Sequence, residues 1–166
     1  NATAELVALH TDAVYAYIYH RLAPRVDLVD DTVQEVFLAA WENLSKFQGA
    51  SSLRSWLIGI ARHKVEDFYR ARLREPHSLE ENEELSGTLR AQKPQFEELL
   101  HRKLIAQKVR RILQSLPESY SLALLWRYWM KRSAREIAVE TGKTEKAVER
   151  LLSRAREHFR KRWNDE

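Results

Sequence analysis

The apolar residues of the stretch 30–74 recur at helical spacing in two long segments. In the first segment they follow the pattern i, i+3, i+4, i+7, i+8, i+11: Val33, Val36, Phe37, Ala40, Trp41 and Leu44. In the second segment, from about residue 53 to residue 74, the apolar set is Leu53, Trp56, Leu57, Ile60, Ala61, Val65 and Phe68. One α-helical turn takes 3.6 residues, so this spacing gives each segment one apolar side. The stretch therefore predicts two amphipathic helices.

A polar loop, residues 45–52, joins these helices, and their outward sides differ in chemistry. The outward side of the first holds Asp31, Gln34, Glu35, Leu38 and Glu42. The outward side of the second is expected to hold Arg54, Arg62, His63, Asp67, Tyr69, Arg70 and Arg74. Both could be ordinary solvated surface. An acidic face beside a basic, aromatic-bearing face favours two different partners.

The composition agrees with an all-α protein. The chain has 166 residues, enough for one domain or two small ones, and its four Gly and four Pro are too few for a sandwich or barrel rich in tight turns. Without cysteine it has no disulfide framework and no thiolate metal site, and its six histidines are scattered. We therefore expect no metal and no cofactor.

No apolar run approaches the length of about 20 residues that a membrane-spanning helix needs, and no signal peptide is visible. Asn1 is not an initiator methionine, so the native start can lie upstream. The default expectation is a cytoplasmic protein without membrane insertion.

Charge is distributed unevenly along the chain. Residues 1–75 hold nine basic and ten acidic side chains, residues 76–100 hold two and six, and residues 101–166 hold seventeen and eight. A basic C-terminal third indicates a polyanionic partner, although basic helices are often only solvated surface.

Breakers and acidic residues with little periodicity occupy residues 76–95, which predicts a linker. The expected organisation is two small helical domains, residues 1–75 and 96–166, joined by this flexible linker.

The first domain opens with a helix over residues 5–22 whose apolar set is Leu6, Leu9, Val14, Tyr17, Ile18 and Leu22. The second opens with a helix that ends at Pro117 and whose stripe is Phe96, Leu99, Leu100, Leu104, Val109, Ile112, Leu113 and Leu116. The next helix is expected to bury Leu122, Leu125, Trp126 and Trp129.

The end of the chain predicts a helix-turn-helix. Ser133 and Glu136 form the pattern of a capping box, and Gly142 supplies a turn after a short helix. Thr144 then caps a longer basic helix that runs to about residue 163. The expected DNA-binding residues at its exposed side are Thr144, Lys146, Glu149, Arg150, Ser153 and Arg154. Arginine can bind guanine through two hydrogen bonds and a glutamate can accept one from cytosine, whereas an isolated helix would more often use such residues as solvated ion pairs.

Two groups of motifs resemble a known family. The first is Asp30-Asp31-x-x-Gln34-Glu35-x-Phe37-x-x-x-Trp41, then Phe47-x-Gly49, then Leu53-Arg54-Ser55-Trp56-Leu57-x-x-Ile60-Ala61-Arg62. It resembles the second conserved region of bacterial sigma factors of the extracytoplasmic-function type. The second group is Leu116-Pro117, Arg127-Tyr128, Glu136-Ile137-Ala138, Gly142 and Arg154-Ala155-Arg156-Glu157. It resembles the fourth region of the same family, and the two regions cover nearly all of the chain except the linker.

The resemblance implies a sigma factor that binds core RNA polymerase and promoter DNA. The polymerase-binding residues it implies are Asp31, Gln34, Glu35 and Leu38. The loop and the following helix would melt and read the minus-ten element through Lys46, Phe47, Gln48, Gly49, Ser51, Ser52, Arg54, Arg62, His63, Asp67 and Arg70. Among these, Arg54, Arg62 and Arg70 stand about two turns apart and can track a phosphate backbone. The second domain would read the minus-thirty-five element, and an anti-sigma factor is a further implied partner.

Two other classes of function compete with this interpretation. A stand-alone helix-turn-helix regulator would bind duplex operators without polymerase. A metal-dependent hydrolase could use His63 and Asp67, whose spacing permits one shared ligand, but no further His or carboxylate cluster completes a site. We therefore expect no catalytic residue and no enzymatic activity.

Overall fold

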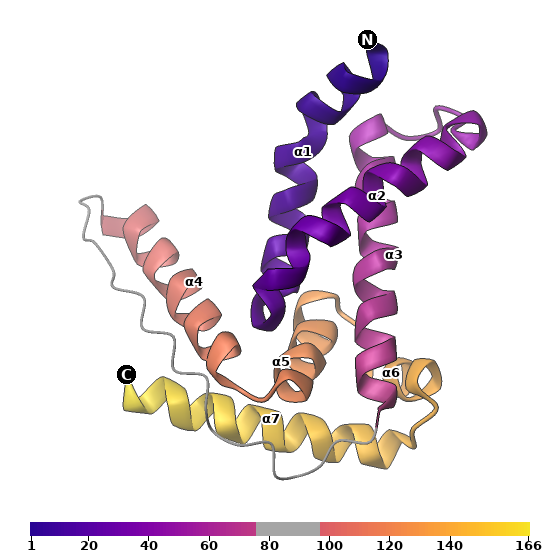
Figure 1. Ribbon diagram of the computed structural model, residues 1–166. Coiled ribbons are helices and arrows are strands. Elements are labelled where there is room, and N and C mark those ends of the chain that lie inside the picture. Colours follow the sequence, from indigo (N-terminus) through magenta and orange to yellow (C-terminus); the bar gives the residue numbers. More distant parts are fainter. Residues whose placement is uncertain (76–96) are drawn as a thin grey trace. The chain divides into compact units, whose positions relative to one another are not determined.

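The computed structural model describes residues 1–75 and 97–166, and the predicted linker, residues 76–95, lies outside them. The described residues form helices joined by turns, with no strand among them, which confirms the all-α prediction (Figure 1). The chain divides into two compact units, Asn1–Arg72 and Leu73–Glu166. Below, the first domain means the helices up to α3 and the second domain means those from α4 onward.

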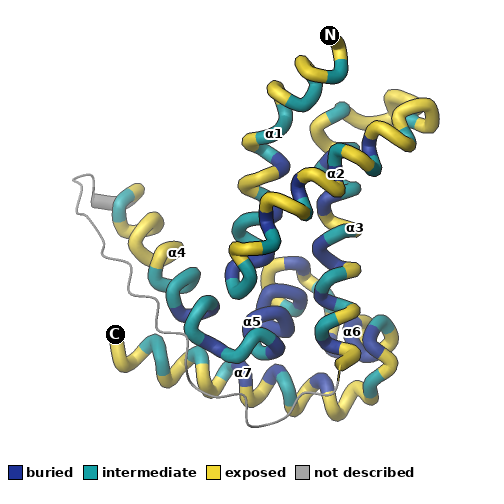
Figure 2. Tube along the Cα trace, in the orientation of Figure 1, coloured by how far each residue is buried: buried dark blue, intermediate teal, exposed yellow. Residues whose placement is uncertain are grey.

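The first domain consists of three α-helices and two short 3₁₀ turns. Its elements are α1 (Ala2–Arg21), η1 (Ala23–Leu28), α2 (Val29–Asn43), η2 (Leu44–Lys46) and α3 (Leu53–Arg74). The largest part of its core is Val14, Ile18, Leu22, Val29, Val36, Ala40, Leu57, Ala61, Val65 and Tyr69. Figure 2 shows these buried positions on the inner sides of the helices, as amphipathic spacing requires.

Tyr69 is fully buried, although the sequence predicts it on the outward side of α3. Residues buried along α3 follow one another every fourth position, and each step of four residues turns the helix by about 40° beyond a full circle. The buried side therefore moves round α3 from Leu57 to Leu73 and includes Tyr69 on the way. The Tyr69 hydroxyl donates a hydrogen bond to the backbone carbonyl oxygen of Arg21 at the end of α1.

Three residues assigned to the apolar sides of their helices are exposed instead: Leu9, Trp41 and Leu44. Leu44 is 38% exposed because it lies in η2, past the end of α2. Leu9 is 77% exposed, because Leu6 and Val7 take the inward side of α1 and Leu9 lies about 200° round the helix from Val7. Trp41 is 59% exposed, and it edges an apolar hollow of about 310 Å³ between α1, α2 and the start of α3. The core of the first domain is therefore open at this end, where Figure 2 shows mostly exposed residues.

The second domain contains four α-helices and one π-helical turn. Its elements are α4 (Glu97–Ser115), α5 (Glu118–Leu124), η3 (Leu125–Trp129), α6 (Ala134–Thr141) and α7 (Glu145–Asp165). Helices α5 and α6 both pack on α7. The core includes Ile112, Leu113, Leu116, Leu122, Leu125, Trp126, Ile137, Val148, Leu152 and Ala155. Pro117 stands at the N-cap of α5.

Trp129 was expected in the core, but it is 43% exposed. The π-helical turn explains the difference: the backbone N–H of Met130 donates to the carbonyl oxygen of Leu125, five residues earlier, at 2.9 Å. This wider turn advances the side chains by a smaller angle per residue than an α-helix does. Met130 consequently takes the buried place. Leu99 and Leu104, also expected inside, are exposed because the first half of α4 lies beyond the buried core.

The helix-turn-helix has the local structure that the sequence predicts. The Ser133 hydroxyl accepts a hydrogen bond from the Glu136 N–H at 3.0 Å, and the Glu136 carboxylate accepts one from the Ser133 N–H at 3.2 Å. Gly142 closes α6 with a left-handed φ of 69°. The Thr144 hydroxyl accepts from the Ala147 N–H at 3.1 Å and starts α7. These caps fix the angle at which α6 leads into α7.

Candidate functional site

The acidic side of α2 lies open to solvent in the first domain. Asp31, Gln34, Glu35 and Leu38 are all exposed, as the helical period predicts. Asp31 and Glu35 stand one turn apart, and the apolar Leu38 follows within the next turn. Paired carboxylates accept the forked hydrogen bonds of arginine, and an adjacent apolar side chain adds contact area. This face can therefore bind a basic partner surface.

The loop between η2 and α3 is anchored by one aromatic contact. The rings of Phe47 and Trp56 lie 5.1 Å apart between centroids, and both are partly buried. Phe47 thus ties the loop to the first turn of α3. The Ser52 hydroxyl accepts a hydrogen bond from the Ser55 N–H at 3.1 Å at the start of that helix. The other predicted loop residues are exposed: Lys46, Gln48, Gly49, Ser51 and Ser52.

A hollow of about 320 Å³, lined by polar and apolar side chains, lies between the end of α2, η2 and α3. It is lined by Ala39, Asn43, Lys46, Trp56, Ile60, His63, Lys64 and Asp67. The hollow brings together three of the predicted minus-ten residues, Lys46, His63 and Asp67, from segments about twenty positions apart. The Asp67 carboxylate also pairs with the Arg70 guanidinium at 2.6 Å. Cations, a carboxylate and an aromatic wall together suit a nucleotide, with its phosphate, base edge and base face.

Arg54, Arg62 and Arg70 do not form the row that their spacing suggested. Each step of eight residues rotates the helix by about 80°, so the three guanidinium groups point to different sides of α3. The Arg62 Nε lies 3.7 Å from the carboxylate of Glu66, which is only 5% exposed. Arg54 is exposed in the first turn of α3. Glu66 is therefore a buried carboxylate beside Arg62.

A polar cluster joins the end of α1 to α3 near Glu66. The Arg21 guanidinium lies 3.6 Å from the centroid of the Tyr17 ring and donates to the Tyr17 carbonyl oxygen at 3.1 Å. Burial raises the pKa of Tyr17 and lowers the pKa of Arg21, and in each case the neighbouring partner opposes the shift. Burial also raises the pKa of Tyr69 well above its ordinary value. The cluster fixes α1 against α3, and the four-residue spacing of the buried stripe was the signal that could have revealed it.

The outward side of α7 carries the residues predicted to read DNA. Thr144, Lys146, Glu149, Arg150, Ser153 and Arg154 are all exposed. Val148, Leu152 and Ala155 are buried on the opposite side, where α5 and α6 pack. The first turns of α7 therefore present polar and charged side chains that can enter the major groove of a DNA duplex.

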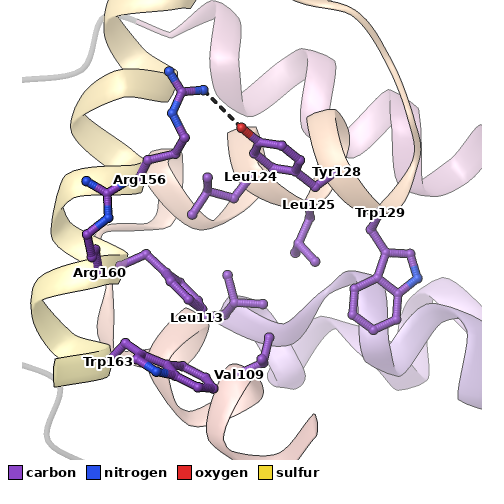
Figure 3. A pocket seen from close by; sticks show the side chains of 10 residues that line it. Val109, Leu113, Leu124, Leu125, Tyr128, Trp129, Arg156, Arg160 and Trp163 are labelled. Atoms are coloured by element: carbon purple, nitrogen blue, oxygen red, sulfur yellow. Dashed lines mark hydrogen bonds between the residues drawn. The ribbon is translucent and has the colours of Figure 1, made fainter. Parts of the chain in front are cut away.

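An apolar groove of about 650 Å³ in the second domain was not predicted from the sequence. Figure 3 shows its lining residues, Val109, Leu113, Leu124, Leu125, Tyr128, Trp129, Arg156, Phe159, Arg160 and Trp163. A guanidinium N–H of Arg156 donates to the Tyr128 hydroxyl at 3.0 Å. The ammonium group of Lys108 donates to the Trp163 carbonyl oxygen at 2.9 Å, which holds the end of α7 against α4. The apolar spacing of this segment predicts Trp129 in the core, so the sequence gives no sign of this groove.

Within residues 1–75 and 97–166, no three His, Cys, Asp or Glu side chains gather as they would to hold a metal ion. His63 and Asp67 line the hollow together without a third such group. Among the described helices, none is long and apolar enough to cross a membrane.

Comparison with known proteins identifies two conserved regions in the chain. Residues 6–75 match the family model for sigma-70 region 2, and residues 106–159 match the model for sigma-70, region 4. The first match covers the acidic face and the hollow, and the second covers most of the groove, all of α6 and most of α7.

Several characterised proteins are similar over most of their length. RNA polymerase sigma factor CnrH of Cupriavidus metallidurans is 32% identical over 159 residues, 93% of this chain and 83% of that protein. The ECF RNA polymerase sigma-E factor of Escherichia coli strain K12 is 32% identical over 148 residues, 86% of this chain and 76% of that protein. A solved structure of CnrH in complex with the cytosolic domain of CnrY has a TM-score of 0.47 and 25% identity, with 99% of this chain and 89% of that chain covered.

Proposed function

The chain belongs to the extracytoplasmic-function sigma factors of the sigma-70 family, and from that premise we propose how its two domains share the work of promoter recognition. As a sigma factor it directs transcription initiation by RNA polymerase. The assignment of this work to individual residues is our proposal. The observation that carries it is that one domain presents both an acidic face on α2 and a hollow with cationic and aromatic side chains between α2, η2 and α3.

The acidic face of α2 binds a basic surface of core RNA polymerase. The support is that Asp31, Glu35 and Leu38 combine exposed carboxylates with an apolar contact on one side of the helix. Such charges steer the encounter and set its orientation, and apolar contact lowers the rate of dissociation.

The hollow between η2 and α3 receives an unpaired base of the minus-ten element. Extruding a base costs a few kcal/mol of stacking and pairing, which contacts in a fitted site can offset. Trp56 offers an aromatic wall, His63 and Asp67 face the base edge, and Lys46 neutralises the neighbouring phosphate. Gln48, Gly49 and Ser51 are exposed on the loop beside it and contact the adjacent strand.

The helix-turn-helix reads the minus-thirty-five element as duplex DNA. Arg150 and Lys146 lie on the exposed side of α7 with Glu149, within two turns of its start. Arg150 binds a guanine through two hydrogen bonds, and Glu149 accepts from a cytosine amino group. The Thr144 hydroxyl is engaged as the helix cap, so its contribution to DNA binding is to place this helix.

The chain itself catalyses nothing, and it works in the cytoplasm, where polymerase and promoters are. An anti-sigma factor is a further proposed partner, supported by membership of a family in which such partners are common.

Run-off transcription tests the proposal. Purified chain is mixed with core RNA polymerase and a library of templates with a randomised promoter region, and the transcribed templates are sequenced. We expect two enriched blocks, one at each element, with the upstream block lost in an Arg150→Ala variant and the downstream block altered in a His63→Ala variant. A chain that starts no RNA with core polymerase on any template, but binds duplex operators alone and tightly, would instead be a stand-alone regulator.

A further inference from the structure

Lys64 lies where the acidic face of α2 meets the hollow. Its ammonium nitrogen is 3.9 Å from a carboxylate oxygen of Glu35. Its side chain also lines the hollow, together with Lys46, His63 and Asp67. One cation is thus shared between a carboxylate of the proposed polymerase-binding face and the proposed minus-ten subsite.

The Glu35–Lys64 ion pair is weak enough for each side chain to take another partner instead. Glu35 is exposed and Lys64 is only partly buried, and pairs of this kind change an equilibrium by no more than about five-fold. A guanidinium from a basic partner would offer Glu35 two short hydrogen bonds, which a lysine at this distance cannot match. Lysine carries a point charge on a flexible stem, so Lys64 can turn from Glu35 to a phosphate without any movement of the backbone.

We propose that Lys64 is a further DNA-contacting residue of the minus-ten subsite, and that Glu35 restrains it until polymerase takes the Glu35 carboxylate. The inference rests on the proposed function, because it needs both the polymerase face and the DNA subsite. Polymerase binding then raises the affinity of the hollow for a phosphate. Linkage makes the effect reciprocal, so DNA that engages Lys64 leaves Glu35 free for polymerase.

The experiment measures DNA binding by the purified full chain. The probe is a fluorescein-labelled single-stranded oligonucleotide of mixed sequence and about 12 nucleotides, read by anisotropy at about 50 mM and about 200 mM salt. The variants are Glu35→Gln, Lys64→Gln and the double variant. Glu42→Gln is the matched control, because Glu42 is exposed on the same side of α2, two turns further along, and loses the same charge.

The expected result is that Glu35→Gln tightens binding by about two- to five-fold relative to Glu42→Gln. The gain should vanish when Lys64→Gln is added. The slope of log affinity against log salt should become shallower by about 0.7 on adding Lys64→Gln to Glu35→Gln, because one phosphate contact is lost. A purely structural role of the pair would leave that slope unchanged.

Equal affinities for Glu35→Gln and Glu42→Gln would overturn the inference, and so would a gain that survives the loss of Lys64. If the free chain binds the oligonucleotide too weakly to measure, the comparison moves to the wild-type and Lys64→Gln holoenzymes. There Lys64→Gln should lower run-off transcription relative to wild type most at low salt, because the phosphate contact that it removes is itself weakened by salt. Unchanged transcription would overturn the inference. A wild-type chain that starts no RNA with core polymerase would overturn the proposed function instead, so the two failures are distinguishable.

Discussion

The hydroxyl of Tyr69 donates its hydrogen bond inside the first domain, where the carbonyl oxygen of Arg21 ends α1. Replacing Tyr69 with Phe leaves that carbonyl without this donor, so we expect a loss of about 1 kcal/mol in the free energy of unfolding. Urea unfolding of the wild type and the variant at neutral pH measures it. A Val65→Ala variant, which opens a cavity without touching the hydrogen bond, separates packing from polar effects.

The same tyrosine predicts a pH dependence of stability. Burial raises the pKa of Tyr69, so the folded chain holds the phenol proton more tightly than the unfolded chain does. Its contribution is therefore complete below the ordinary tyrosine pKa of about 10 and is lost as the pH rises through the higher folded value. Unfolding measured from about pH 8 to about pH 11 should show a steeper loss in the wild type than in Tyr69→Phe. Equal slopes would mean that Tyr69 does not govern the alkaline limit.

Arg150 is the residue whose loss should change specificity rather than affinity alone. Arg150→Ala should cost about 1–3 kcal/mol of discrimination at one position of the minus-thirty-five element. Competition binding of holoenzyme to duplexes with single base changes measures this cost. Arg160→Ala is the matched control. It removes the same charge from α7, but at a residue that lines the groove rather than the proposed DNA-reading side. A loss that is uniform across all duplexes would identify Arg150 as a phosphate contact.

At the scale of residues, the sequence predicts what the helical period decides and misses what a neighbouring element decides. Glu35 and Arg150 are exposed as expected, because their positions follow from counting along one helix. Tyr69 is buried although it was expected outward, because it packs against the end of α1. Trp129 is exposed although it was expected inside, because of the π-helical turn. The hollow likewise depends on Lys46 meeting α3, which no local pattern encodes.

At the scale of elements, two of the three described glycines, all with open surroundings, predict opposite effects. A Cβ added to Gly142 or to Gly59 would meet no atom within 4 Å, so only the backbone conformation distinguishes them. Gly142 has a left-handed φ, and Gly142→Ala should lower stability by about 1–2 kcal/mol. Gly59 lies inside α3, and Gly59→Ala should raise stability by about 0.5–1 kcal/mol. Thermal unfolding of both variants checks the contrast, and effects of the same sign would contradict it.

Element boundaries were the best-predicted part of the fold. The expected helix from about residue 53 to residue 74 agrees with α3, and the capping box places the start of α6 at Ala134. Both depend on side chains close in sequence, such as Ser133 and Glu136. The first half of α4 was misjudged for the opposite reason, because its apolar side has no covering element among the described residues of its domain.

At the scale of the whole molecule, charge reversal on α2 should separate binding from folding. Asp31→Lys combined with Glu35→Lys should abolish capture of core RNA polymerase, because both side chains are exposed and contribute little to the core. Circular dichroism and thermal unfolding should remain those of the wild type. Asp12→Lys, on the exposed side of α1, changes charge without touching the proposed face and should leave capture intact. Undiminished capture by the double variant would exclude this face.

Each domain closes around a small core of its own, and aromatic or aliphatic side chains such as Trp41, Tyr128 and Trp129 remain outside. Domains of this size bury a smaller share of their surface than larger ones, so their margin against unfolding is narrow. A partner that binds only the native form widens that margin in proportion to the logarithm of its concentration over its dissociation constant. Chains that are not bound to polymerase should therefore be degraded first by cellular proteases. The half-life of this polypeptide should lengthen as the amount of free core RNA polymerase rises.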